Sequence, residues 1–136
     1  MTTIFESAIR AAVDRFNKGN LEGYLELYKE DAALHYLPPE LPGGIAGARL
    51  FYGMYLTAFP DIHVGVDDVI GEGDRVVVRY TITGTHQGEL MSIPASGKAV
   101  SVPAITILRV NNGKCVERWS EADMMGLMTQ IGAVPA

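Results

Sequence analysis

Residues 74–119 constrain the fold most, because apolar and polar side chains alternate along them with a period of two. This period is typical of a β-strand with one buried and one solvated face. It predicts strands over 75–86, 100–110 and 114–119. The Asn111-Asn112-Gly113 segment predicts a tight hairpin turn between the last two strands, since Asn and Gly accept a positive φ. The centre of the chain is therefore an antiparallel sheet whose apolar face needs a cover.

Helical spacing of apolar residues predicts that cover. The expected helices span 4–18, 21–28, 48–59 and 121–131. Two further strands are expected over 32–37 and 61–70. Helices on one face of a mainly antiparallel sheet define an α+β fold, and a concave sheet capped at one end leaves a pocket at the other.

Length and charge narrow the class of protein. The 136 residues predict one domain over 1–136, large enough to bury a normal core. A net charge of −5 without a basic cluster argues against nucleic-acid binding, and no apolar run is long enough to cross a membrane. Cys115 is the single cysteine, and no signal-peptide pattern is present, so we expect a cytoplasmic protein without disulfides.

Several segments, in the same order along the chain, resemble one known family. They are Phe59-Pro60-Asp61, Gly73-Asp74-Arg75-Val76, Gly84-Thr85-His86-Gln87-Gly88, and Gly113-Lys114-Cys115-Val116-Glu117-Arg118-Trp119 followed by Asp123 and Gln130-Ile131-Gly132. This pattern resembles the SnoaL-like polyketide cyclases, within the nuclear-transport-factor-like fold shared with ketosteroid isomerases and limonene epoxide hydrolases. The resemblance implies a cone-shaped roll, in which the curved sheet wraps around the N-terminal helices and encloses a central pocket.

The resemblance also implies a reaction. Polyketide cyclases of this family close a ring on a polyaromatic ester by intramolecular aldol condensation, without cofactor or metal. Their acid/base groups are an aspartate after the last strand and a histidine on the strand before it. The aligned positions here are Ser120 and Thr106. A serine hydroxyl accepts a proton at neutral pH only when another base activates it, so this chain departs from the family's chemistry at both positions.

The expected function is a cofactor-independent enzyme of polyketide cyclase or isomerase type, acting on a small apolar or aromatic substrate by general acid/base chemistry. A non-catalytic binding protein for a hydrophobic metabolite and an epoxide-hydrolase-like activity are the alternatives. A dimer-forming scaffold is a third reading, because the polar sheet face with Arg79, Thr81 and Thr83 is available to a second copy. We expect a homodimer through this face.

Three residues are candidate catalytic groups. Asp123 is the nearest carboxylate to the end of the last strand, where an apolar pocket would raise its pKa and suit it to acid/base work. The alternative is that Asp123 caps the C-terminal helix. His86 shares strand parity with Tyr80 and is expected to face the pocket, or else to bond the following turn. His35 is the third candidate if it faces inward from its short strand.

The remaining candidates would contact the substrate: Tyr36, Met54, Tyr80, Met91, Thr106, Trp119 and Ser120. No metal site is expected, because the three histidines are widely separated and Cys115 stands alone.

Glu117 and Arg118 alternate on the last strand, so one of them faces inward and needs a partner. A cross-strand pair of Glu117 with Arg79 or Arg109 is the simplest arrangement.

Overall fold

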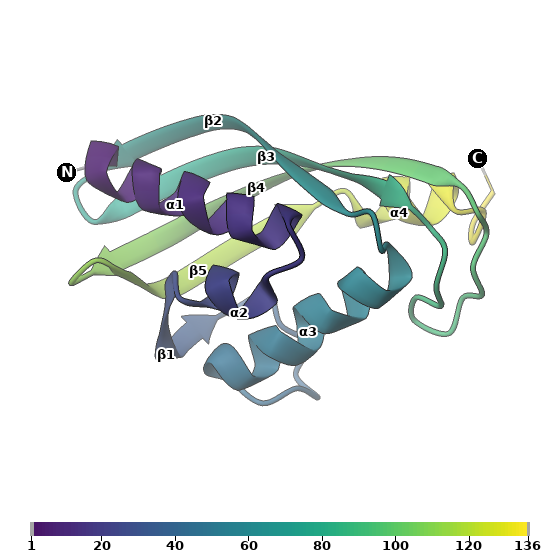
Figure 1. The fold of residues 1–136 in the computed structure, drawn as a ribbon, viewed down its shortest axis with the longest axis horizontal. Helices are drawn as coiled ribbons and strands as arrows, with labels where there is room; N and C mark the ends of the chain where they lie inside the picture. Colours follow the sequence, from purple (N-terminus) through teal and green to yellow (C-terminus); the bar gives the residue numbers. More distant parts are fainter. Residues whose placement is uncertain (1, 136) are drawn as a thin grey trace.

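The structure is a computed structural model that describes residues 2–135 (Figure 1). Its elements follow the predicted order of helices and strands. They are α1 (Thr2–Asn17), α2 (Leu21–Leu25), β1 (Tyr28–Leu34), α3 (Gly44–Ala58), β2 (His63–Glu72), β3 (Arg75–Thr85), β4 (Ala99–Asn111), β5 (Lys114–Ala122) and α4 (Met124–Gln130).

The strands form one curved sheet in the order β1-β5-β4-β3-β2. β1 pairs with β5 in parallel, and the other neighbours are antiparallel. The α+β class and the mainly antiparallel roll are confirmed. The predicted hairpin joins β4 to β5, with Asn112 at φ 52° and Gly113 at φ 75°. Two successive positive φ angles match the twist of the flanking strands, which explains the Asn-Gly pair.

The helices α1 and α3 lie on the concave side of the sheet (Figure 1). The apolar stripe of α1, including Phe5, Ile9 and Phe16, is buried there. The end of α1 is tied to β2 by Asn17, whose amide donates to the carbonyl of Val64 at 3.0 Å and whose oxygen accepts from its N–H at 2.8 Å. This pair of bonds substitutes for a neighbouring strand and fixes where the helix crosses the sheet.

One irregularity in β5 decides which side chains enter the concave face. Val110 pairs with Cys115, but Arg109 pairs with Glu117, so Val116 is an extra residue without a partner on β4. Such a β-bulge shifts the alternation of side chains by one position. Cys115 and Arg118 are consequently both buried on the inner side, although an odd spacing of three separates them.

The convex face of the sheet is not covered by any described helix (Figure 1). It carries a row of apolar residues in cross-strand register, one from each of four strands: Ile70, Val77, Ile107 and Trp119. Ile70 and Ile107 are 61% and 38% exposed. No helix among residues 2–135 is both long and apolar enough to cross a membrane.

Candidate functional site

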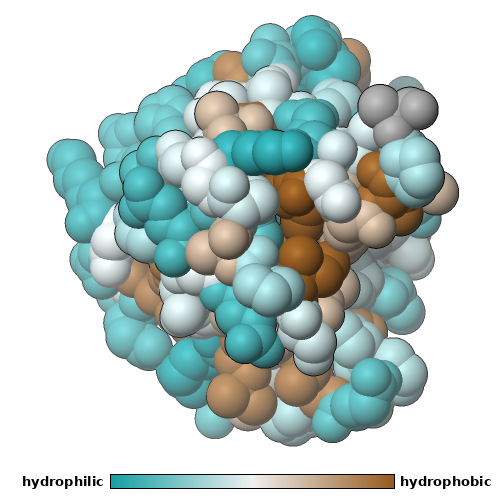
Figure 2. Space-filling model, turned by 90° about the vertical axis from the view of Figure 1, so that its right-hand side faces the viewer, coloured by the Kyte–Doolittle hydropathy of each residue, from teal (hydrophilic) through white to brown (hydrophobic). Residues whose placement is uncertain are grey.

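A cavity of about 450 Å³ lies between the helices and the concave face of the sheet. This volume falls in the range of small-molecule sites. Most of the wall is apolar and comes from α1, α3, β2–β4 and the segment between α3 and β2, including Ile9, Phe16, Phe51, Phe59, Ile62, Val78, Val100 and Leu108. Met124 also lines the cavity and is 37% exposed, so the cavity reaches the surface beside α4. Hydrophobic residues form a band on that end of the molecule (Figure 2).

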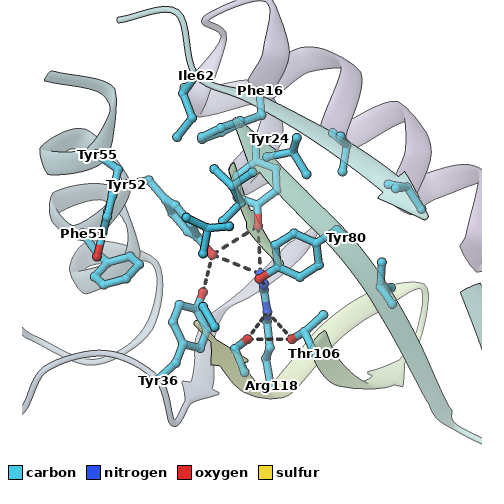
Figure 3. Close-up of a pocket in the computed structure, with 18 of the residues that line it drawn as sticks. Phe16, Tyr24, Tyr36, Phe51, Tyr52, Tyr55, Ile62, Tyr80, Thr106 and Arg118 are labelled. Atoms are coloured by element: carbon cyan, nitrogen blue, oxygen red, sulfur yellow. Dashed lines mark hydrogen bonds between the residues drawn. The ribbon is translucent and has the colours of Figure 1, made fainter. Parts of the chain in front are cut away.

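The polar part of the cavity is centred on Arg118, which is 7% exposed (Figure 3). Its Nε donates to Thr106 Oγ1 at 2.7 Å and to Ser120 Oγ at 3.0 Å. Four tyrosine hydroxyls accept from the other two nitrogens. Nη1 donates to Tyr24 and Tyr52, both at 3.0 Å, and to Tyr28; Nη2 donates to Tyr80 at 3.1 Å.

A tyrosine ring completes the surroundings of the guanidinium. The Cζ atom of Arg118 lies 4.8 Å from the ring centroid of Tyr36, a cation–π contact. The hydroxyl of Tyr36 lies 2.6 Å from that of Tyr52. The tyrosines come from α2, β1, α3, β3 and the segment after β1, so the cluster forms only when the helices pack on the sheet.

Arg118 carries its charge without a carboxylate partner. None of the ion pairs among residues 2–135 includes it. Burial lowers the pKa of Arg118, but the surrounding tyrosines, Tyr28 foremost, raise it by more, and the pKa lies above its usual value. The guanidinium is therefore a cation at any physiological pH. A buried cation held only by hydroxyl dipoles is costly unless a further group neutralises it.

The tyrosines are neutral donors in this setting. Burial raises the pKa of Tyr36 to about 12, although the charge of Arg118 acts in the opposite direction. Burial also raises the pKa of Tyr24, Tyr28 and Tyr52 above the usual value for tyrosine. A hydroxyl that keeps its proton at neutral pH can stabilise negative charge on a ligand oxygen by donating a hydrogen bond.

Four of the expected substrate-contacting residues line this cavity: Tyr36, Tyr80, Thr106 and Ser120. Thr106 and Ser120 are directly paired residues on β4 and β5, with their hydroxyl oxygens 2.6 Å apart. These are the two positions to which the resemblance assigns a histidine and an aspartate. In this chain both hydroxyls instead accept a hydrogen bond from Arg118.

Two of the expected catalytic residues are not among those that line the cavity. Asp123 is exposed at the start of α4, where its Oδ1 accepts from the N–H of Gly126 at 2.8 Å, so it forms the helix cap that was the alternative interpretation. His86 is fully buried beside Phe59, and its Nδ1 accepts from the N–H of Ser96 at 3.1 Å. Asp123 and His86 therefore do not meet in the cavity as the sequence suggested, because Asp123 caps the start of α4 and His86 anchors the 87–98 segment.

His35 borders the cavity, but its ring is held on the outer side of the sheet edge. It stacks on Trp119 with centroids 5.3 Å apart, and its Nε2 lies 2.7 Å from Glu117 Oε2. Trp119 does not line the cavity and belongs to the apolar row on the convex face. Glu117 also accepts from Arg109 Nε at 2.9 Å, which confirms one of the two pairings expected for Glu117.

The two methionines expected to contact substrate are exposed and do not line the cavity. Met54 is 44% exposed, because it lies on the side of α3 that faces away from Tyr52 and Tyr55. Met91 is 53% exposed and has a φ of 48°, at the tip of the irregular 87–98 segment. Their flexible side chains therefore contribute nothing to the cavity wall in this structure.

Sequence reasoning missed the centre of the site, Arg118, and three of its partners, Tyr24, Tyr28 and Tyr52. The signal available was the alternation of Glu117 and Arg118, which required one of the two charges to be inside. A buried tyrosine usually finds a partner for its hydroxyl, so the number of tyrosines in the predicted helices was a second signal. Neither signal said that these groups converge.

The donor set does not suggest a metal centre. Among residues 2–135, no three His, Cys, Asp or Glu side chains gather closely enough to hold an ion. Cys115 is fully buried, and burial raises the pKa of its thiol to about 11, so it is not a nucleophile at neutral pH.

The fold and the cavity together define an α+β roll that encloses a small-molecule site. The chain matches the family model of the SnoaL-like polyketide cyclases over residues 6–131 and belongs to that family.

Individual relatives agree with this assignment. The chain is 26% identical over 128 residues to aklanonic acid methyl ester cyclase DnrD of Streptomyces peucetius, covering 91% of this chain and 88% of the relative. Among solved structures, TsrD from Streptomyces laurentii superimposes with a TM-score of 0.89 at 27% identity, over 98% of this chain and 99% of that one. AclR from Streptomyces galilaeus also gives a TM-score of 0.89, at 29% identity, over 100% and 85% of the two chains.

Proposed function

We propose that this protein is an enzyme of cyclase or isomerase type that acts on a small apolar or aromatic carbonyl compound inside the cavity. The observation that carries the proposal is a buried cation, Arg118, surrounded by neutral hydroxyls at one end of an otherwise apolar cavity. Acid/base catalysis by the protein's own side chains suffices for this reaction, so the proposal calls for no cofactor.

The chemistry follows from the charge. Removal of a proton from a carbon next to a carbonyl forms an enolate, whose negative charge sits mainly on oxygen. Arg118 and the nearby hydroxyls stabilise that charge without reorganising, which is the largest single contribution in many enzymes. In a cyclisation, the enolate carbon then forms a bond to a second carbonyl carbon of the same molecule, and the new alkoxide takes up a proton. The proposed acceptor of the carbon-bound proton is Glu121, a carboxylate that borders the cavity. His35 also borders the cavity, but its ring is already engaged with Trp119 and Glu117.

Turnover of an aromatic polyketide ester, such as the methyl ester named for DnrD, tests the proposal. Arg118→Met is expected to lower kcat/KM by about 100-fold or more, the usual effect of removing oxyanion stabilisation. The matched control is Arg79→Met, which removes an exposed arginine on the convex face and leaves turnover unchanged. Undiminished turnover in Arg118→Met would refute the assigned role.

A non-catalytic binding protein is the second candidate, and the residues at Ser120 and Thr106 favour it. These hydroxyls stand where the resemblance implies the family's proton-transfer groups. A carrier of a hydrophobic metabolite would show a ligand-dependent rise in melting temperature without any product. Product formation at the wild-type cavity would exclude this candidate.

We further propose that the protein is a cytoplasmic homodimer, joined through the apolar row on the convex face. The support for the dimer is that Ile70, Val77, Ile107 and Trp119 lie in register and are partly exposed. The free thiol of Cys115 supports a reducing compartment. Light scattering is expected to give twice the chain mass for the wild type and the single chain mass for Ile107→Asp. A monomeric wild type at micromolar concentration would contradict the dimer.

A further inference from the structure

The hydroxyl protons around Arg118 can be assigned from the hydrogen bonds. On the β4–β5 side every proton has an acceptor. Thr106 donates to the carbonyl of Trp119 at 2.8 Å, so the 2.6 Å contact between Thr106 and Ser120 uses the proton of Ser120. Both oxygens also accept from Arg118 Nε. This side of the cluster is closed and offers no donor to a ligand.

The tyrosine side also offers an acceptor for each of its hydroxyl protons. Tyr24 donates to Tyr52 at 3.3 Å, and the hydroxyls of Tyr36 and Tyr52 lie 2.6 Å apart. The hydroxyl of Tyr28 interacts with those of both Tyr24 and Tyr36. The proton of Tyr36 therefore has an acceptor within the cluster.

Two spare donors lie on the other side of the guanidinium. Arg118 Nη2 carries two protons and donates one of them, to Tyr80 at 3.1 Å. Among the described residues this is the single hydrogen bond of Nη2 and of the Tyr80 hydroxyl. One N–H of Arg118 and the O–H of Tyr80 are therefore without an acceptor there.

Both spare donors belong to residues that line the cavity, and Figure 3 shows Tyr80 beside the Arg118 side chain. Buried polar groups are nearly always paired, so two donors at one cation mark a place where an acceptor belongs. Neutral acceptors such as water satisfy the protons but leave the charge of Arg118 uncompensated. An anionic oxygen satisfies both.

We propose that Arg118 Nη2 and the hydroxyl of Tyr80 form a preformed subsite for an anionic oxygen, and that the cavity prefers aromatic ligands that carry a carboxylate or enolate. The inference deepens the proposed function, since the same subsite would hold the enolate oxygen of a substrate. It rests on that proposal only for the apolar cavity, because an anion can bind without being turned over.

Equilibrium binding of a matched pair of ligands tests the subsite. The probes are 2-naphthoate and its neutral methyl ester, titrated at pH 7 by calorimetry. The acid is expected to bind at least about tenfold more tightly than the ester, because a charge-assisted hydrogen bond to a buried donor contributes on that scale. Equal affinities, or no saturable binding of the acid, would overturn the proposal.

A variant then assigns the donor. Tyr80→Phe keeps the ring and is expected to weaken acid binding about tenfold while leaving ester binding unchanged. Tyr55→Phe is the matched control, because Tyr55 lines the cavity without contacting Arg118, and its ratio of acid to ester affinity should equal that of the wild type. A wild-type ratio in Tyr80→Phe would overturn the assignment.

The binding result is independent of turnover. Preferential binding of the acid with no product from any ester would support the subsite and refute the proposed enzyme. Turnover that depends on Arg118, combined with equal binding of acid and ester, would refute the subsite and leave the enzyme assignment intact.

Discussion

Glu117 and Arg118 are neighbours on β5, but they point to opposite faces of the sheet, and only the charge of Glu117 has ion-pair partners among the described residues. Glu117 points to the convex side and is paired with both His35 and Arg109. Arg118 points to the concave side and has six hydroxyl partners but no ion-pair partner among residues 2–135. The charge of Glu117 is neutralised within the protein, whereas the charge of Arg118 has no counter-ion in the part of the chain that the structure describes and is available to an anionic ligand.

The difference matters because the two environments differ in their dielectric response. An exposed ion pair contributes little, since water already solvates both partners. A buried charge without a counter-ion costs much more, and hydroxyl dipoles offset only part of that cost. A fold that holds such a charge beside an apolar cavity is therefore preorganised for an anionic ligand. Measurements of unfolding free energy can distinguish the contributions of the concave and the convex face.

The largest expected effect is loss of stability in alkali, and it comes from the concave side. Burial raises the pKa of Tyr36 to about 12 and raises that of Tyr24, Tyr28 and Tyr52 as well. Unfolded tyrosines lose their protons near pH 10 while the buried ones keep theirs, so their stabilising contribution is complete below pH 10 and is lost as the pH rises. Above about pH 10, each such tyrosine should lower the free energy of unfolding by a further ~1.4 kcal/mol per pH unit.

Urea unfolding between pH 8 and 11 measures this decline, and ultraviolet difference spectra follow the tyrosines directly. Tyr36→Phe should flatten the decline by the contribution of one group. If every tyrosine of the folded protein ionised near pH 10, the buried cluster described here would be wrong.

An intermediate effect is expected when Arg118 loses one of its hydroxyl partners. Thr106→Val preserves shape, but it removes an acceptor from a buried cation and should lower the free energy of unfolding by about 1–3 kcal/mol. In an Arg118→Met background the same substitution should cost much less, because no buried charge remains to be left unpaired. Thr81→Val, which removes a hydroxyl from the exposed face of β3, is the control and should cost little. If Thr106→Val lowered the free energy of unfolding equally in both backgrounds, the charge of Arg118 would not be the cause of the loss.

The smallest effect is expected on the convex face. Hydrogen bonds from His35 and then from Arg109 lower the pKa of Glu117, so the paired carboxylate stabilises the fold above the ordinary carboxyl pKa and loses this contribution as the pH falls. Glu117→Gln should lower the urea midpoint at pH 7 less than Thr106→Val does. The difference from wild type should shrink both in acid and in high salt, which screens exposed pairs. A large decrease in the urea midpoint of Glu117→Gln that does not depend on salt would contradict the view that Glu117 forms exposed ion pairs.

Much of the fold was predictable because it depends on local patterns. The alternation of Val76, Val78, Tyr80 and Ile82 follows directly from strand geometry, and the Asn112-Gly113 turn follows from backbone sterics. The boundaries were less accurate. β1 begins at Tyr28, earlier than expected, because its parallel pairing with β5 is a long-range contact that no local pattern encodes.

The site was only partly predictable, for the same reason. Strand parity placed Tyr80 correctly, and the family resemblance pointed to Thr106 and Ser120. Parity also placed His86 on the buried side, where it packs beside Phe59. It does not line the cavity, because its imidazole is bonded to Ser96 of the 87–98 segment, a contact that strand parity cannot predict.

The sequence by itself determined that one charge of the Glu117–Arg118 pair had to face inward, since a strand alternates and a buried charge needs partners. Only the tertiary structure decided that the inward charge is Arg118, because the unpaired residue Val116 sets the register of β5 after Cys115. The tertiary structure also brought Tyr24, Tyr28 and Tyr52 to that charge from three separate elements. Their convergence depends on how the helices cross a curved sheet, which is a property of the packed chain rather than of any segment within it.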